Sequence, residues 1–337
     1  MPKTTFSYAP AYYGNPSSGA AALPAQKAAM TAIHNGLLAI GLTQLSDTGQ
    51  LDIDAMPAMT ATGTTENVAG FRLYEMVDEL TPTLRVIIKV EFCRPPLGHT
   101  MAQYAEVMLN ISVGHNTDGA GNFVGGSVLV SKQVQATSSS TPARAPSVQS
   151  FMCVKDHTIL LAVGLSVAVV STAPSTPIIA GFAVIGRTRD ADGLADGRGV
   201  VGFGSADDAA LTTLDHRMVM SLSVPSAGIA MKNIKDSPGL MGAYLSMASV
   251  SGAPQVQFPM AAVPRMYPFT QMGMIPVGGA LSVGDIIELD VDGAVRQYVA
   301  LSPFNIWPSL IGPTVSINGR SASSVFFDCG FSMLYET

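Results

Sequence analysis

Charged side chains are scarce in this sequence, at 12% of its 337 residues, and it has a single tryptophan and three cysteines. A typical soluble domain carries about 25% charged residues. Because hydrophobic residues reach 47%, the composition excludes intrinsic disorder, which needs low hydrophobicity and high charge. It also excludes long exposed helices and coiled coils, which depend on Glu, Lys and Arg. The simplest explanation is a surface that is largely covered by other protein.

Positive charge is scarcer than negative charge. The chain has 18 Lys and Arg against 24 Asp and Glu, a net charge of −6, and no window holds more than two or three basic residues close together. Proteins that bind nucleic acid usually carry a basic patch or stripe. We therefore expect no nucleic-acid partner.

Long hydrophobic runs are absent as well. The longest run, from Ile159 to Val170, covers about a dozen residues and contains Gly164 and Ser166, whereas a helix that crosses a bilayer needs about 20 apolar residues. We expect a buried pair of β-strands here and no membrane span.

The cysteines do not form a recognisable pattern. Cys93, Cys153 and Cys329 are an odd number, widely spaced and without a C-x-x-C pair. Cys153 and Cys329 lie in apolar runs, so we predict buried free thiols. A reducing place of assembly fits this usage better than secretion does.

Catalytic and cofactor motifs are also missing from the sequence. Only Gly197 to Gly202 matches G-x-G-x-x-G, a pattern that binds dinucleotides when it follows a strand and opens a helix. Here it follows an Asp/Gly loop, and residues 200–204 have the composition of a strand. The histidines are scattered without metal-ligand spacing. We expect no cofactor and no enzymatic activity.

Asp190, Asp192 and Asp196 form a weak candidate calcium site. An EF-hand loop needs a ligand at its fifth position and a bidentate Glu at its twelfth. Leu194 and Val201 occupy those positions here. A turn-forming loop is therefore favoured over a metal site, and we expect no bound metal.

One amphipathic helix is predicted over residues 24–45. Pro24 suits the first turn of a helix, and a turn at residues 47–50 follows it. His34, beside the apolar face, is interpreted as a structural histidine rather than a ligand. The residues that recur at helical spacing and predict the buried face are Ala29, Ile33, Leu37 and Ile40.

The rest of the chain is predicted to be mainly β. Short segments rich in β-branched residues alternate with Gly, Asn and Asp turns; one predicted strand resumes at Phe123, and Asp292-Gly293 indicates a tight hairpin within 282–301. We expect two β-sandwich or jelly-roll-like units, the N-terminal helix and an extended N-terminal arm. The predicted divisions are an arm at 1–23, a helix plus β domain at 24–136, a linker or mobile loop at 137–147, and a second β domain with Pro/Met-rich segments at 148–337.

Two groups of residues are candidates for contacts between subunits. An exposed, solvated arm would rarely carry three tyrosines and a phenylalanine, so the arm docks either on a neighbouring subunit or on its own domain. The methionines between prolines at 259–276 suit plastic packing between subunits, with ordinary core filling as the alternative. The candidate interface residues are Phe6, Tyr8, Tyr12, Tyr13, Met260, Met266 and Met272.

Three stretches carry a resemblance to a known class of proteins: Gly41 to Asp52, Gly70 to Phe92 and Val113 to Asn122. In composition and in the order of these motifs, residues 25–130 resemble structural proteins of the tailed-bacteriophage virion, of the tail, neck and baseplate type. The resemblance implies a location in the virion, assembled in the cytoplasm of the host bacterium. It carries over no functional residues.

We therefore expect a non-enzymatic structural subunit that assembles with identical copies and with other virion proteins. The alternatives are a receptor- or carbohydrate-binding module at a tail tip, and a minor capsid or decoration protein. A binding module needs an exposed aromatic or acidic pocket, for which Tyr104, Trp307 and the loop at 187–197 are the candidates.

Overall fold

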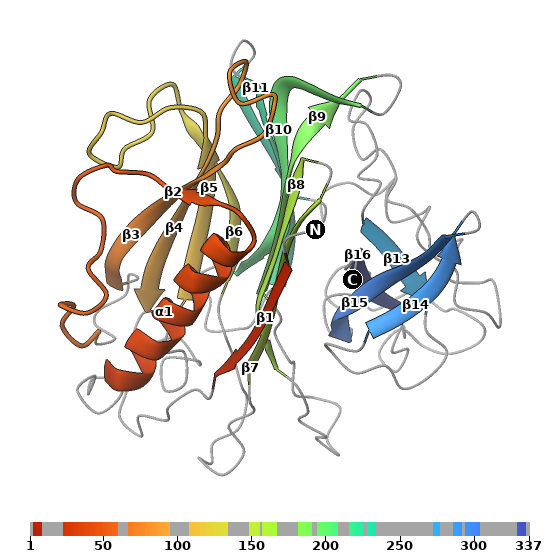
Figure 1. Ribbon diagram of the computed structural model, residues 1–337, viewed down its shortest axis with the longest axis horizontal. Coiled ribbons are helices and arrows are strands. Elements are labelled where there is room, and N and C mark those ends of the chain that lie inside the picture. The colour runs from red at the N-terminus through yellow and green to blue at the C-terminus, as the bar shows by residue number, and fades with distance from the viewer. Residues whose placement is uncertain are drawn as a thin grey trace, which may run out of the picture.

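Figure 1 shows the computed structural model. It describes residues 3–8, 23–59, 67–94, 108–133, 148–155, 157–166, 181–190, 194–207, 216–224, 228–233, 272–276, 286–291, 294–303 and 329–334. The first elements are β1 (Lys3–Tyr8), α1 (Leu23–Ala39), β2 (Thr43–Gln44), β3 (Asn67–Met76), β4 (Val86–Arg94), β5 (Met108–Gly114) and β6 (Ser127–Gln133). They are followed by β7 (Val148–Lys155), β8 (Thr158–Ser166), β9 (Gly181–Arg189), β10 (Ala195–Asp207), β11 (His216–Val224) and β12 (Gly228–Asn233). The last are β13 (Met272–Pro276), β14 (Ile286–Val291), β15 (Ala294–Pro303) and β16 (Cys329–Leu334).

The strands form two sheets. Ten strands of the 12-stranded sheet follow the order β1-β7-β8-β9-β10-β6-β5-β4-β3-β2, and β11 and β12 extend from β10. All pairings in it are antiparallel except a short parallel contact between β10 and β6. The second sheet has four antiparallel strands in the order β13-β16-β15-β14. The predicted mainly β class with one helix is confirmed for the described residues.

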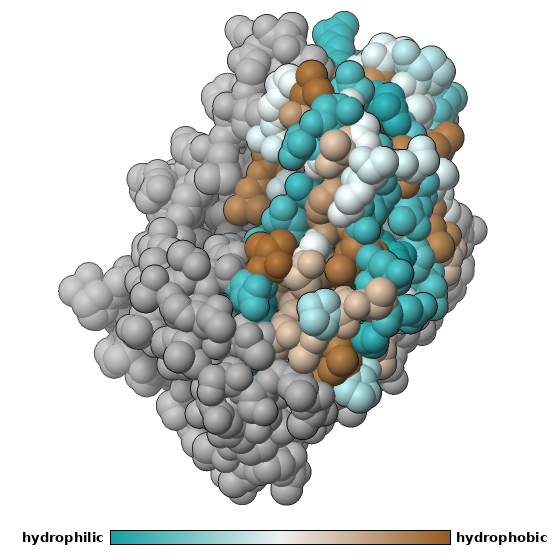
Figure 2. Space-filling view, turned by 90° about the vertical axis from the view of Figure 1, so that its left-hand side faces the viewer, coloured by the Kyte–Doolittle hydropathy of each residue, from teal (hydrophilic) through white to brown (hydrophobic). Residues whose placement is uncertain are grey.

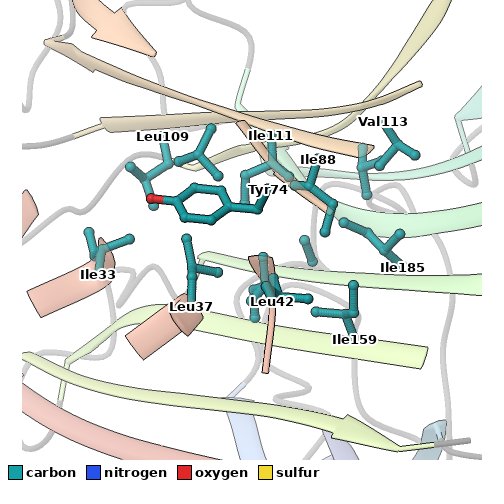
Figure 3. Close-up of a cluster of buried hydrophobic side chains, with 14 of the residues drawn as sticks. Ile33, Leu37, Leu42, Tyr74, Ile88, Leu109, Ile111, Val113, Ile159 and Ile185 are labelled. Carbon is teal, nitrogen blue, oxygen red and sulfur yellow. The ribbon is translucent and has the colours of Figure 1, made fainter. Parts of the chain in front are cut away.

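One hydrophobic cluster joins the helix to both halves of the large sheet. Figure 3 shows side chains of α1 and of β3 to β5 meeting side chains of β8 and β9. Side chains alternate between the two faces of a β-strand, so every second residue of these strands can face the same cluster. Labelled members of the cluster are Ile33, Leu37, Tyr74, Ile88, Ile111, Ile159 and Ile185.

The helix buries the predicted face, since Ala29, Ile33, Leu37 and Ile40 are each at most 1% exposed. The predicted end of the helix at residue 45 is wrong. Gly41 has a φ of 94°, its N–H donates to Leu38, and the N–H of Leu42 donates to Leu37. This is the Schellman arrangement that closes a helix.

Several predicted strands are confirmed. The run that starts at Ile159 is predicted to hold a pair of strands, but its described part forms the single strand β8, which is paired on both sides by β7 and β9. β14 and β15 pair antiparallel from Val291 and Ala294 outward, as the predicted hairpin requires, and Asp292 and Gly293 lie outside the described residues. The G-x-G-x-x-G match lies inside β10 rather than before a helix.

The prediction that a strand resumes at Phe123 is wrong, since β6 begins at Ser127. Gly125 and Gly126 have φ angles of 83° and 101°, a conformation that interrupts an extended strand and that glycine adopts without a Cβ clash. The segment at 137–147 lies outside the described residues. Strands on both of its sides belong to one sheet and contribute to one core cluster, and the predicted domain boundary there stays a prediction.

No helix in the described part of the chain combines the length and the apolar character needed to cross a membrane.

The predicted structural role of His34 agrees with its contacts. Its Nδ1 lies 2.9 Å from the hydroxyl of Tyr74, which is fully buried. Burial, and then the positive charge of Arg72, lower the pKa of His34 from its usual 6.5. Burial raises the pKa of Tyr74. At neutral pH both groups are therefore uncharged, and the hydrogen bond between them joins α1 to β3.

We expect Tyr74→Phe to lower the free energy of unfolding by about 1 kcal/mol, the usual net value of such a bond. Because the folded pKa of His34 lies below the unfolded one, its contribution is complete above pH 6.5 and declines as the pH falls through that value. Urea titrations at pH 7.5 and 5.5 measure both effects. His34→Gln is the control, because it should lose less stability than the wild type between these two pH values; equal losses would contradict this account.

Candidate interaction surface

Several connections between strands lie together at one end of the large sheet, the upper end in Figure 1. We call this the loop end, and we define it by residues 77–85, 115–126, 157, 190 and 194–197. Hydrogen bonds and close contacts join these connections to one another and to the adjoining strands. The loop end is therefore held in a defined conformation. It is the candidate interaction surface.

A buried ion pair holds the first of these connections. Arg187, on β9, donates from Nε and Nη2 to the two carboxylate oxygens of Asp78 at 2.8 and 2.7 Å, and from Nη1 to the carbonyl of Leu84 at 2.7 Å. The Arg187 side chain has no exposed surface. Paired donors from one guanidinium fix a carboxylate in both position and orientation.

His157 adds a second link to the same carboxylate. It occupies the turn between β7 and β8 with a φ of 61°, and its ring nitrogens lie 3.0 Å from Asp78 and 3.2 Å from Glu79. Desolvation alone would raise the pKa of Asp78. The hydrogen bonds from Arg187 and His157 and the charge of Arg187 outweigh it and lower the pKa to about 2. Asp78 is therefore ionised at neutral pH and joins its own connection to the β7–β8 turn and to strand β9.

The connection between β5 and β6 closes on itself through Asp118. Its carboxylate accepts hydrogen bonds from the backbone of Ala120 and from the backbone and side chain of Asn122. These bonds, led by the side chain of Asn122, lower the pKa of Asp118. They account for the Gly/Asn/Asp composition of this loop, because short polar side chains satisfy a turn's free amides.

The same connection contacts residues near the helix. The N–H of Thr48 donates to Gly119 at 2.8 Å, and the N–H of Gly121 donates to Asp47 at 3.2 Å. His115 lies 2.9 Å from the carbonyl of Arg85. Residues 47–48, 70–75 and 114–122, which come from the three stretches of the virion-protein resemblance, are thus brought together by the fold.

Exposed apolar side chains are concentrated on the loop end. Five large hydrophobic residues of the described part are exposed, and three of these lie on its connections: Val77 at 59%, Val124 at 49% and Leu194 at 65%. On the face that Figure 2 shows, apolar residues are set among hydrophilic ones. Single exposed apolar residues are normal, but apolar residues exposed on loops that hydrogen bonds hold in place suit a contact surface.

The predicted interface residues are in part described. Phe6 and Tyr8 lie in β1, where they pair with Ser150 and Val148 of β7, so residues 3–8 follow the alternative in which the arm packs on its own domain. Met272 begins β13 and pairs with Met333. Tyr12, Tyr13, Met260 and Met266 lie outside the described residues, and the interface role of all seven stays a prediction.

Hydrogen bonds of the turn type hold the two described aspartates of the loop at 187–197. Asp190 accepts from the N–H of Leu194 at 2.9 Å, and Asp196 accepts from Thr188 and from the N–H of Arg198. Asp192 lies outside the described residues. Among the residues that are described, no three His, Cys, Asp or Glu side chains gather in a way that could hold a metal ion.

Cys93 is a buried free thiol, as predicted, and burial raises its pKa to about 12. Cys153 and Cys329 lie in β7 and β16. Tyr104 and Trp307, two of the places considered for a ligand pocket, lie outside the described residues.

Sequence reasoning missed the cluster of Asp78, His157 and Arg187. Its members are separated by up to 109 positions, and none stands in a motif, so only the pairing of β7, β8 and β9 brings them together. His157 lies in the turn between β7 and β8, and no local pattern in the sequence indicates that Asp78 is its partner.

Comparisons with known proteins found no matching family, no similar curated protein and no similar solved structure.

Proposed function

We propose that this protein is a non-enzymatic structural subunit of a bacteriophage virion. It assembles with copies of itself and with other virion proteins in a tail, neck, collar or baseplate. We also propose that its two sheets belong to two β-sandwich or jelly-roll-like units. The resemblance of residues 25–130 to virion proteins is the basis for the setting, and the following observations support the mode of assembly.

The loop end carries the proposal. Exposed Val77 precedes Asp78, which is held by the fully buried guanidinium of Arg187, and exposed Leu194 is held by two hydrogen bonds to Asp190. An interface is costly when loops must be ordered on binding, and loops that are already fixed avoid that cost. A rigid surface with exposed apolar residues is therefore suited to lasting contacts.

The distribution of charge points the same way. Between residues 237 and 284 the only charged side chain is Arg265. A segment of this length with one charged side chain gains little from exposure to water. It is well suited to burial, either within the subunit or against a neighbour, as is typical of extensive permanent interfaces.

Strand edges offer a second mode of contact. Among the described strands, β12 pairs only with β11, and β14 only with β15. Unpaired N–H and C=O groups along such an edge are a template for a strand of another chain. Identical subunits could extend their sheets in this way.

Size-exclusion chromatography with light scattering tests self-assembly on the purified full chain. We expect a discrete oligomer or a concentration-dependent series of them. A monomer that stays soluble and unassociated at high concentration would overturn the self-assembly part of the proposal.

The contribution of the loop end is tested by Leu194→Asp. A charge placed on an apolar contact must be buried without a partner, so we expect the apparent dissociation constant of the oligomer to rise at least tenfold. Val68→Asp is the matched control, because Val68 is also exposed, at 49%, but lies near the start of β3, away from the loop end. Equal weakening by both variants would remove the loop end from the interface.

A further inference from the structure

The ring of His157 lies between two carboxylates, with one at each of its nitrogens. Nδ1 lies 3.0 Å from Oδ2 of Asp78, and Nε2 lies 3.2 Å from Oε1 of Glu79. Among the described side chains, the charged groups that face the ring are these two from the 77–85 connection and Arg187 from β9. Nε of Arg187 donates to the same Asp78 oxygen at 2.8 Å. The His157 side chain is 23% exposed, so it can exchange a proton with solvent.

The backbone at His157 is also unusual. Its φ of 61° is the only positive value at a non-glycine residue in the described part of the chain. The left-handed region is unfavourable for residues with a Cβ, although histidine enters it more often than most. An outlier of this kind that positions a polar side chain points to a role for that side chain. Here the turn holds the ring between the two carboxylates.

The two contacts of the ring have different proton requirements. A neutral imidazole has a single N–H, whereas the protonated ring has two. The hydrogen bonds of Asp78 hold its pKa at about 2, so its carboxylate only accepts and Nδ1 must carry the hydrogen. In the neutral ring, Nε2 then presents a lone pair to the Glu79 carboxylate, and the two acceptors repel each other. Once Nε2 is protonated, the same approach is a charge-assisted hydrogen bond.

We propose that His157 is a proton-dependent latch for the 77–85 connection. The protonated ring joins Asp78 and Glu79, whereas the neutral ring keeps Asp78 and releases Glu79, whose side chain is 74% exposed and can turn into solvent. Histidine is the side chain that ordinarily changes charge between about pH 5 and 8. Because the Glu79 contact needs the bound proton, it forms at the acidic end of this range and is lost as the pH rises.

The latch lies beside an exposed apolar residue of the loop end. Val77 directly precedes Asp78 and is 59% exposed, so the release of Glu79 changes the charge and shape of the surface next to it. A pH dependence of assembly through this surface rests on the proposed function. The latch itself concerns a single chain and holds whether or not the protein is a virion subunit.

Nitrogen NMR of the full chain, labelled at its histidine rings, tests the latch. At pH 8 we expect a neutral His157 ring with its hydrogen on Nδ1, and at pH 5 a ring protonated at both nitrogens. In Glu79→Gln the ring should take up its second proton at a lower pH than in the wild type, because one facing carboxylate has been removed. His34, on α1, is the internal control and should titrate as before.

His157→Asn identifies the His157 signals by their loss, since asparagine also tolerates the left-handed conformation. If that variant does not fold, replacing the other histidines one at a time gives the same assignment. Two results would overturn the proposal. One is a neutral ring with its hydrogen on Nε2, because such a ring could donate to Glu79 without a second proton. The other is a titration of His157 that Glu79→Gln leaves unchanged.

Discussion

Arg187→Leu is expected to lower the free energy of unfolding by about 3–5 kcal/mol, the cost of breaking a buried ion pair by removing one partner. The change leaves the carboxylate of Asp78 without its paired donors and the carbonyl of Leu84 without its hydrogen bond. Leucine fills part of the space, so the loss arises from unpaired polar groups rather than from a large cavity.

Urea denaturation followed by circular dichroism measures this loss. Arg198→Leu is the matched control, since Arg198 also pairs with an aspartate, Asp196, but its side chain is 82% exposed. Exposed pairs are worth about 0–1 kcal/mol, so we expect little change. A comparable small change for Arg187→Leu would show that the Asp78 cluster does not hold the connections together.

A double variant separates the charge of Asp78 from the packing of Arg187. When both partners are removed, no charge remains buried, so Asp78→Ala combined with Arg187→Leu should cost less than the sum of the two single changes. Strict additivity would indicate that the two side chains act independently.

Gly121→Ala is expected to lower the free energy of unfolding by more than about 2 kcal/mol, through left-handed strain and overpacking together. Gly121 has a φ of 87°. A Cβ added there would lie 2.0 Å from the Phe71 ring, whose other contacts include the ammonium of Lys89. Either the ring or the loop must move.

Gly119→Ala isolates the backbone part of this effect. Gly119 has a similar φ of 79°, but no atom lies within 4 Å of an added Cβ. We expect it to cost about 1–2 kcal/mol, the strain of the left-handed conformation alone. Thermal or chemical unfolding of the two variants side by side is sufficient. Equal losses would mean that the contact between Gly121 and Phe71 does not constrain the loop.

Both experiments test whether the loop end is rigid, which the proposed assembly requires. If Gly121→Ala loosens the 115–126 connection while the core stays folded, the oligomer should weaken together with it. Light scattering on the same samples therefore links the stability measurements to the interface.

Local sequence patterns predicted those structural features that depend on interactions between residues close together in the chain. The helical spacing of Ala29, Ile33 and Leu37 identified the buried face of α1, and Asp292-Gly293 identified a hairpin. Both signals depend on residues close in the chain. The helix end was placed too late because the apolar residues continue past Gly41, and the Schellman closure there depends on a single positive φ angle.

The sequence by itself determined that the described part of the chain is mainly β with one amphipathic helix, because periodicity and turn residues act over a few positions. It also determined that charged side chains are scarce, at 12% of the residues. Only the tertiary structure decided that β1 pairs with β7 and that Arg187 meets Asp78. The physical reason is that strand register joins residues tens of positions apart, and no local pattern records which strands become neighbours.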